Sequence, residues 1–401
     1  MALLSVAEAL ARVTQGLVPL EAERVVLGSA SGRVLAEDLA ARMTQPPFDA
    51  SAMDGYAVRA EDVAALPATL RLIGVAAAGA GFDGQVGRGE AVRIFTGAPV
   101  PQGADTIVIQ ENVEESHGVL TAKEAEPDRH IRPRGQDFKE GEVLLVAGTR
   151  LGPRELMLAA AMNHAELPVR RKPKVAILAT GDEVVPPGSE LGKDQIVSSV
   201  PIGLATLIER TGGEAMSLGI AKDDPNSLVT LAHAGSAADI LVTIGGASVG
   251  ERDLVASALK SEGLEIDFWK IAMRPGKPLL FGMLGGQRVL GLPGNPVSAL
   301  VSAYVLLVPM LEHMLGVAAK AVPLPQAMLG EALEANGPRQ HYLRARSEWR
   351  EDGTRVVRPL PSQDSSLVAD LARADCLIVR APDTPALALG ARVRIVPFDR
   401  D

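Results

Sequence analysis

Acidic and glycine residues follow the predicted strands in the middle of the chain. A buried strand predicted over 175–179 ends in the turn Thr180-Gly181-Asp182-Glu183, and the strand predicted over 214–220 is followed by Asp223. Ligands of open α/β sheets bind beyond the carboxyl ends of the strands, so these turns are expected to lie at one edge. Glu183 and Asp223, together with Asp253 farther along, predict a Mg²⁺ site, because Mg²⁺ prefers carboxylates, waters and substrate phosphates.

A glycine-rich loop follows the next predicted strand, 239–244. It reads Gly245-Gly246-Ala247-Ser248-Val249-Gly250 and precedes a helix predicted over 253–261. Small residues let backbone N–H groups converge on an anion, and a helix N-terminus adds a favourable dipole. We therefore expect this loop to hold a phosphate.

Three basic residues without an intervening acid lie at the end of the strand predicted over 266–271 and in the turn after it. They are Lys270, Arg274 and Lys277, and Pro275, Gly276 and Pro278 restrict the backbone around them. A last turn, Pro293-Gly294-Asn295-Pro296, precedes a helix predicted over 296–315. Carboxylates for a metal and bases for an oxyanion together predict chemistry on a phosphorylated ligand.

The elements that position these turns alternate between strand and helix from 172 to 318. Helices predicted over 202–210 and 225–234 separate the strands, which indicates a doubly wound, mostly parallel α/β domain. Ser5 and Glu8 form a capping box that begins an amphipathic N-terminal helix. Short apolar runs between turns predict a small β-rich domain near 43–139, and alternating residues after about 322 predict β structure again.

Composition excludes several classes of protein. The chain has 401 residues, of which 47% are hydrophobic, so it can bury several cores. A single cysteine, Cys376, excludes an intramolecular disulfide framework. The net charge of −9 argues against non-specific nucleic-acid binding. The apolar run 297–311 is too short to span a membrane and predicts a buried core helix, and the N-terminus does not resemble a signal peptide, so we expect a soluble, cytoplasmic protein.

Several segments, taken together and in this order, identify a family. They are the segment from Phe48 to Val58 (FDASAMDGYAV), the segment from Arg93 to Pro101 (RIFTGAPVP), the Thr-Gly-Asp-Glu turn, the GGASVG loop, Pro275-Gly276-Lys277-Pro278, and Gly291-Leu292-Pro293-Gly294-Asn295-Pro296. With them the chain resembles, along essentially its full length, the molybdopterin molybdotransferases, which are the MoeA and gephyrin E-domain family.

The resemblance implies four domains. These are a segmented N-terminal domain (1–42 plus 142–171), a small β-rich domain (43–141), an α/β domain (172–318) that binds molybdopterin and nucleotide, and a C-terminal β-barrel-like domain (319–401). It also implies an elongated homodimer whose active site lies between the α/β domain of one subunit and the small β domain of the other.

The activity that the resemblance implies is molybdenum cofactor biosynthesis. Family members take adenylylated molybdopterin and molybdate and, with Mg²⁺, release AMP and place molybdenum on the dithiolene. An upstream molybdopterin adenylyltransferase is the expected partner that supplies the substrate.

Functional residues are carried over by position. Asp54 and Thr96 match the small β domain's functional positions, Glu183, Asp223 and Asp253 match acidic ones, and Lys270 and Lys277 match basic ones. Pro293 and Pro296 shape the last loop, while Arg344 and Ser365 match cleft residues of the C-terminal domain. Arg274 stands where the family usually has Lys, and Val197 and Val200 replace an Asp and an Asn that would face the nucleotide.

Two other functions remain open. Val197 and Val200, in place of the family's Asp and Asn, are compatible with a non-catalytic molybdopterin-binding or scaffold protein of the same fold. The segment Gly246-Ala247-Ser248-Val249-Gly250 also matches the nucleophile elbow of α/β-hydrolases, with Asp267 and His313 or His341 as possible partners of Ser248.

Overall fold

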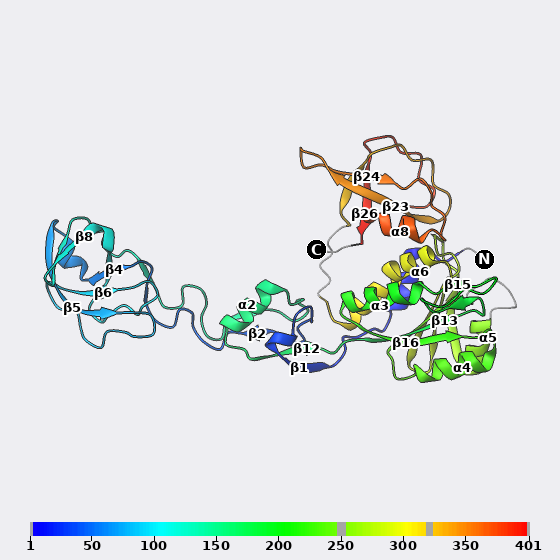
Figure 1. Ribbon diagram of the computed structural model, residues 1–401, viewed down its shortest axis with the longest axis horizontal. Coiled ribbons are helices and arrows are strands. Elements are labelled where there is room, and N and C mark those ends of the chain that lie inside the picture. Colours follow the sequence, from blue (N-terminus) through cyan, green and yellow to red (C-terminus); the bar gives the residue numbers. More distant parts are fainter. Residues whose placement is uncertain (1–2, 247–253, 318–323, 399–401) are drawn as a thin grey trace. The chain divides into compact units, whose positions relative to one another are not determined.

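The computed structural model describes residues 3–246, 254–317 and 324–398. The chain forms two compact units (Figure 1). The smaller unit comprises Arg24–Ser31 and Glu37–Pro168, and the larger unit comprises Met1–Glu23, Gly32–Ala36 and Val169–Asp401. The backbone passes from one unit to the other within strands β1 (Ala22–Val26) and β12 (Glu166–Arg170) and also on either side of Gly32–Ala36.

The smaller unit is built on a six-stranded sheet with the strand order β7-β4-β6-β5-β9-β8. Its core contains Tyr56, Val58, Leu70, Val108 and Leu120, all of them buried. Apart from the parallel pair β5–β6, neighbouring strands are antiparallel. The strands are β4 (Gly55–Val58), β5 (Ala68–Ala76), β6 (Glu90–Ile94), β7 (Thr106–Ile109), β8 (Val113–Ser116) and β9 (Val119–Ala122).

Two short antiparallel ladders and one helix complete the smaller unit. Helix α2 (Pro153–Ala161) begins with proline at its first position, and Glu155 accepts a hydrogen bond from the backbone N–H of Gly152 at 3.0 Å. The ladders pair β3 (Ala50–Ser51) with β10 (Ile131–Arg132) and β2 (Leu39–Ala40) with β11 (Val143–Leu145).

The larger unit contains a second six-stranded sheet, with the order β16-β13-β17-β21-β20-β18. The first four strands are mutually parallel, and β20 is antiparallel to both of its neighbours, so β18 runs in the same direction as β21. The predicted α/β fold is thus confirmed, with one antiparallel strand added. The strands are β13 (Lys174–Thr180), β16 (Glu214–Ala221), β17 (Ile240–Ile244), β18 (Leu264–Trp269), β20 (Leu280–Leu284) and β21 (Gln287–Leu292).

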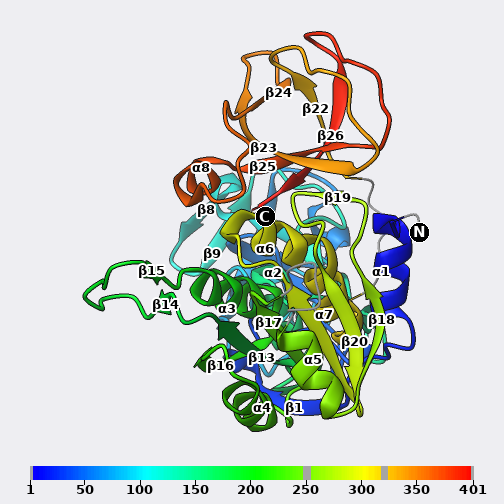
Figure 2. The same cartoon turned by 90° about the vertical axis from the view of Figure 1, so that its right-hand side faces the viewer.

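Helices cover both faces of this sheet (Figure 2). Val175 and Ile177 of β13 face the cluster that contains α1 (Val6–Thr14) and α3 (Val200–Thr211), while Ala176 and Leu178 face the cluster that contains α4 (Pro225–Ala234) and α5 (Leu254–Ser261). This alternation follows from the period of two residues in a strand. Helix α1 begins in the predicted capping box, in which Ser5 and Glu8 exchange hydrogen bonds of 2.9 and 3.2 Å.

The predicted core helix is present but is not uniformly α-helical. It consists of α6 (Pro296–Ser302), a π-helical turn (Ala303–Leu307) and α7 (Val308–Met314). Among the described residues this segment alone has the length and apolar composition to cross a membrane. Because 72% of its apolar window is buried within the fold, it is accounted for as a core helix.

A closed five-stranded barrel follows the α/β sheet, and its strands pair in the cyclic order β23-β24-β22-β26-β25. Leu329, Ala345, Val357, Ile378 and Ile395 fill its core. Strand β19 (Met273–Arg274) leaves the α/β domain and pairs with β23, which joins the two domains. The remaining elements are β22 (Gln326–Leu329), β23 (Gln340–Trp349), β24 (Arg355–Pro359), α8 (Val368–Arg373), β25 (Cys376–Arg380) and β26 (Arg392–Pro397).

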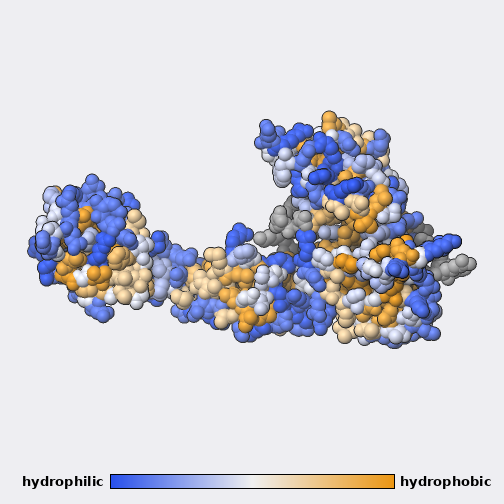
Figure 3. Space-filling view, in the orientation of Figure 1, coloured by the Kyte–Doolittle hydropathy of each residue, from blue (hydrophilic) through white to orange (hydrophobic). Residues whose placement is uncertain are grey.

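Figure 3 shows a mostly hydrophilic surface that is interrupted by apolar patches on both units. Contiguous apolar patches of this kind on soluble domains commonly mark surfaces that a ligand or another protein covers. Isolated exposed apolar residues such as Met157 need no such explanation.

Helix α3 provides a test of the packing on the sheet. Leu204 is fully buried in the main cluster, so Leu204→Ala should destabilise the larger unit by about 2–5 kcal/mol through lost contacts and a cavity. Ile202, on the same helix, is 59% exposed, and Ile202→Ala is the matched control, with an expected effect within about 0.5 kcal/mol. The melting temperature from calorimetry reports both, and equal values for the two variants would contradict this packing.

Candidate functional site

The turns predicted to form a site meet at the carboxyl edge of the α/β sheet. The N–H of Asp223 donates to the Asp182 carboxylate at 3.1 Å, which joins the turns after β16 and β13. The N–H of Gly181 donates to the carbonyl of Ala221 at 3.3 Å, and that of Gly245 donates to the carbonyl of Leu292 at 3.1 Å. Four neighbouring strands therefore contribute to one continuous set of turns.

Glycine is required in the first of these turns. Gly181 has φ +133°, a conformation that other residues rarely adopt, and a Cβ there would lie 2.7 Å from a carboxylate oxygen of Glu183. The Glu183 carboxylate thus folds back over its own turn, while its backbone carbonyl accepts a hydrogen bond from Ile196 at 2.8 Å. Asp182, Glu183 and Asp223 are all exposed at this edge.

The turns after β17 and β21 also approach each other closely. A Cβ on Gly294 would lie 3.6 Å from the Cα of Gly245, and one on Gly245 would lie 3.0 Å from the Thr180 hydroxyl. Gly245 and Gly246 both have positive φ, +86° and +63°. The loop that follows, with Ser248 and Gly250, and the predicted metal ligand Asp253 lie outside the described residues. The described residues alone contain no group of three metal-ligating side chains.

The basic residues lie in one loop between β18 and β20. Its base is closed by hydrogen bonds from Lys270 N–H to Leu279 at 2.9 Å and from Ile271 N–H to Lys277 at 3.1 Å. Gly276 has φ +101°, and a Cβ on it would come within 2.5 Å of the Ser302 hydroxyl, so the loop packs tightly on α6. Lys270 is half-buried, and Arg274 and Lys277 are exposed.

No described carboxylate forms an ion pair with these three cations. Strands β18, β21, β17, β13 and β16 all end at the same edge, so the basic loop and the acidic turns belong to one edge of the sheet. Positive charges without described carboxylate partners and exposed carboxylates on one sheet edge are suited to an extended anionic ligand that carries a divalent cation.

The barrel adds Ser365 to this edge. Asn295 Nδ2 donates to Ser365 Oγ at 2.9 Å, and the N–H of Val297 donates to the Ser365 carbonyl at 3.1 Å. The turn Pro293-Gly294-Asn295-Pro296, which begins α6, is thereby held against the barrel.

Arg344, also predicted to face the cleft, is 1% exposed. Its guanidinium donates to the backbone carbonyls of Ser362 at 3.0 Å, Asp364 at 2.8 Å and Leu367 at 3.1 Å. The structure therefore places Arg344 beneath the loop that carries Ser365, where it positions that loop.

His341 is a neighbour of the basic loop that the sequence did not reveal. It is 9% exposed and stands in register with Arg274 in the β19–β23 pair. Burial, followed by the charges of Arg274, Arg339 and Arg380, lowers the pKa of His341 to about 4. The imidazole is therefore neutral at pH 7. Only the pairing of two strands far apart in the chain brings this residue here.

The contacts do not support the hydrolase alternative. Asp267 forms an ion pair of 2.8 Å with Arg12 of helix α1, and His313 Nδ1 lies 2.9 Å from the carbonyl of Pro309 in its own helix. Asp267 and His313 thus make other interactions, and His341 stands in register with Arg274.

In the smaller unit the structure brings Asp54 and Thr96 together. Both the N–H and the hydroxyl of Thr96 donate to Asp54 Oδ1 at 2.8 Å, and the N–H of Gln110 donates to the Asp54 carbonyl at 3.1 Å. The two Thr96 hydrogen bonds lower the pKa of Asp54, with a further contribution from the charge of Arg93. The register of β4 and β6, Gly55 opposite Ile94, sets this contact.

Arg93 supports this pair, and its position was not predicted. Its guanidinium lies over the rings of Tyr56 and Phe95, 4.8 and 5.2 Å from their centres, and donates to the Gln110 side chain at 2.5 Å. Phe48, Met53 and Phe95 are 39–42% exposed, and Met53 and Phe95 directly precede Asp54 and Thr96 in the sequence.

The positions that depart from the family pattern lie after the Glu183 turn. Strand β15 (Ile196–Val197) pairs with β14 (Val184–Val185), and Ile196 and Val197 are 58% and 42% exposed. Val200 is the first residue of α3. An apolar surface therefore stands where polar groups were expected.

Comparison with known proteins gives a consistent result over the whole chain. Three family models match: the MoeA N-terminal region (domain I and II) over residues 4–163, a probable molybdopterin binding domain over 176–313, and the MoeA C-terminal region (domain IV) over 326–398.

Similar proteins span nearly the same length. A molybdopterin molybdenumtransferase of Haemophilus influenzae is 36% identical over 385 residues, which is 95% of each chain. One of Synechococcus elongatus is 40% identical over 75% of this chain and 77% of its own. A crystal structure of a molybdopterin biosynthesis MoeA protein from Pyrococcus horikoshii matches all of both chains with a TM-score of 0.85 and 33% identity.

The Asp54–Thr96 pair leads to a prediction about protonation. Thr96→Val removes the hydroxyl donor, so the pKa of Asp54 should rise toward its ordinary value, and in a falling titration Asp54 should protonate at a higher pH. The stabilisation from ionised Asp54 is present above its unfolded pKa and is lost as the pH falls through the depressed folded pKa, so the variant loses it earlier.

Carbon NMR of the labelled Asp54 carboxyl reports this pKa directly. Thr69, exposed in β5, supplies the control variant Thr69→Val, which should leave the titration of Asp54 unchanged. An Asp54 pKa that does not move in Thr96→Val would show that the hydroxyl does not stabilise the carboxylate.

Proposed function

The chain belongs to the MoeA family, whose curated members are named molybdopterin molybdenumtransferases, and we propose that it performs the Mg²⁺-dependent insertion of molybdate into adenylylated molybdopterin in the cytoplasm. In this reaction molybdenum is placed on the dithiolene, the phosphoanhydride bond to the adenylate is cleaved, and AMP leaves. The family as a whole places the chain in molybdenum cofactor biosynthesis.

One observation carries the proposal. The loop with Lys270, Arg274 and Lys277 presents cations without described carboxylate partners at the same sheet edge as Glu183 and Asp223. In our proposal these cations attract molybdate and the phosphates and offset the charge that develops as AMP leaves. Asn295 and Ser365, hydrogen-bonded to each other, border the same edge.

The residues at this edge fit Mg²⁺. Glu183 and Asp223 are exposed oxygen donors, and Mg²⁺ typically uses one or two carboxylates while it keeps several waters and substrate phosphates. Asp253 is the third proposed ligand. When bound, Mg²⁺ would neutralise phosphate charge, and Glu183 and Asp223 would hold it at this edge of the sheet.

We further propose that the protein is a homodimer and that Asp54 and Thr96 complete the site from the partner subunit. The exposed apolar side chains of Met53 and Phe95, next in sequence to Asp54 and Thr96, support a covered surface. An upstream molybdopterin adenylyltransferase is the proposed source of the substrate.

A second candidate is a non-catalytic binding protein of the same fold. The exposed apolar residues Ile196 and Val197, next to the Glu183 turn, favour it, because they offer no hydrogen bonds to a nucleotide. This candidate binds adenylylated molybdopterin but does not release AMP from it.

Release of AMP separates the two candidates. Purified protein with adenylylated molybdopterin, molybdate and Mg²⁺ should release AMP, and Lys277→Ala should reduce the rate by about 100-fold or more because a charge that stabilises the leaving phosphate is lost. Lys260, exposed on α5, provides the control Lys260→Ala with an unchanged rate. Ligand binding without AMP release by the unaltered protein would instead establish the non-catalytic candidate.

Mixed dimers test the shared site. Asp54→Asn and Lys277→Ala should each be inactive alone. If every site combines Asp54 of one subunit with Lys277 of the other, a one-to-one mixture of re-equilibrated subunits regains about a quarter of the full activity, because half of the dimers are mixed and each has one intact site. If both residues came from one subunit, the mixture would stay inactive.

A further inference from the structure

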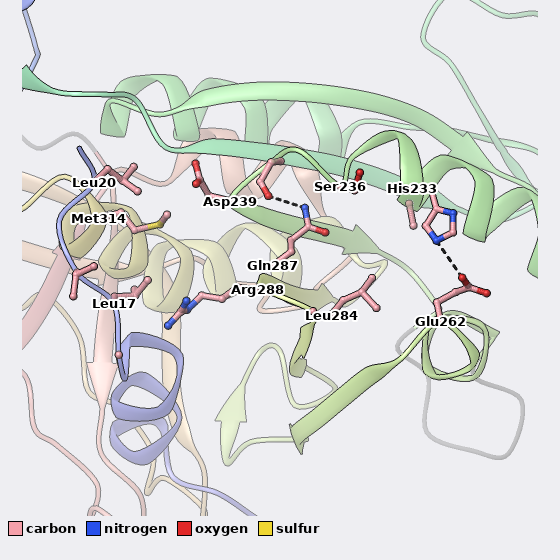
Figure 4. Close-up of a pocket in the computed structure, with 16 residues that line it drawn as sticks. Leu17, Leu20, His233, Ser236, Asp239, Glu262, Leu284, Gln287, Arg288 and Met314 are labelled. Atoms are coloured by element: carbon pink, nitrogen blue, oxygen red, sulfur yellow. Dashed lines mark hydrogen bonds and ion pairs between the residues drawn. The ribbon is translucent and has the colours of Figure 1, made fainter. Parts of the chain in front are cut away.

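A cavity of about 590 Å³ lies at the amino ends of β17 and β21, away from the turns described above (Figure 4). Asp239 and Arg288 stand at the starts of these two strands, whereas Gly245 and Pro293 follow their carboxyl ends. Five residues of strand separate the two edges by about 16 Å. We propose that this cavity binds a small organic anion that has an apolar body, such as a medium-chain carboxylate.

Arg288 supplies the positive charge. Its side chain is half-buried, Nη2 donates to the carbonyl of Gln15 at 2.7 Å, and Nε is buried without a partner among the described residues. Burial alone lowers the pKa of Arg288, and no described carboxylate forms an ion pair with it. Since arginine remains charged far above pH 7, the cavity contains an uncompensated cation.

The other charged groups that line the cavity are already paired. Asp239 accepts two hydrogen bonds from Arg171, at 2.7 and 2.8 Å, and a third from the N–H of Lys174 at 2.7 Å. His233 lies 3.1 Å from Glu262 (Figure 4). The charge left for a ligand is therefore the positive charge of Arg288, and an anion is the complementary partner.

Apolar side chains form the wall beside this cation. Leu17, Leu20 and Met314 line the cavity, and Figure 4 shows the Arg288 guanidinium on the same side as Leu17 and Met314. Leu284, from the strand before the β20–β21 turn, adds to the apolar lining. Cavities that combine apolar walls with a few polar groups are the usual form of small-molecule sites. The volume is ample for a carboxylate with an eight-carbon chain.

A purely structural role explains only part of this arrangement. Gln15 is the C-terminal cap of α1, and a cation at a helix C-terminus is favourable, which accounts for the Nη2 hydrogen bond. It supplies a neutral carbonyl and no negative charge, so the guanidinium charge still has no described counter-ion. A bound anion beside this cation accounts for its burial without a carboxylate partner.

Binding can be measured with the fluorescent anion anilinonaphthalene sulfonate. The full-length protein should show one saturable site from which octanoate displaces the probe, whereas octanol, which has the same chain without the charge, should displace it at least about tenfold less well. Arg288→Gln should weaken probe binding by at least about tenfold. Arg12→Gln is the control. It also removes one arginine charge from the larger unit, and this variant should bind the probe normally.

A second variant tests the charge without removal of the Gln15 contact. Leu17→Glu places a carboxylate beside Arg288 and should weaken anion binding as Arg288→Gln does, while Arg288 stays in place. Octanol as effective as octanoate, or full binding by both variants, would overturn the proposal. The proposal would also be overturned if the unaltered protein did not bind octanoate and Arg288→Gln only lowered the melting temperature, because Arg288 would then have a purely structural role. AMP release plays no part in this test, so its outcome is independent of the proposed function.

Discussion

The close approach of backbone turns at the carboxyl edge of the α/β sheet is the constraint on which the site depends. A Cβ on Gly245 would lie 3.0 Å from the Thr180 hydroxyl and one on Gly246 would lie 2.3 Å from Val255, and both glycines have positive φ, so these positions favour glycine. Gly181 and Gly276 meet the same requirement through positive φ. The directions of the strands place the charged residues at this one edge, and the glycines let neighbouring turns pack closely there.

The basic loop at this edge is positively charged, although the chain as a whole is negatively charged. The net charge is −9, yet Lys270, Arg274 and Lys277 have no described carboxylate partners. Burial and the neighbouring arginines lower the pKa of His341 to about 4, so it adds no charge at pH 7. A local field of this kind, set by a few fixed side chains, concentrates anions in a way that the net charge of the protein does not indicate.

Much of this arrangement could be predicted from the sequence, because strand ends and glycine turns are local features. The hairpin β20–β21 was missed, although two apolar runs on either side of Gly285-Gly286 indicate it. The contacts of Arg344 and His341 could not be predicted, since they depend on barrel strands that pair over long distances in sequence. Arg93 was missed for the same reason: its stacking on Tyr56 and Phe95 follows from the β4–β6 register.

Both edges of the α/β sheet carry cations without described carboxylate partners, but the surroundings of these cations differ. At the carboxyl edge, Arg274 and Lys277 are exposed, so a strongly hydrated anion and its metal can bind there without losing all of their water. At the amino edge, Arg288 is half-buried beside Leu17 and Met314, and only an anion that brings its own apolar surface gains from entering. Burial of the cation, more than its presence, therefore distinguishes the classes of anion that the two edges would accept.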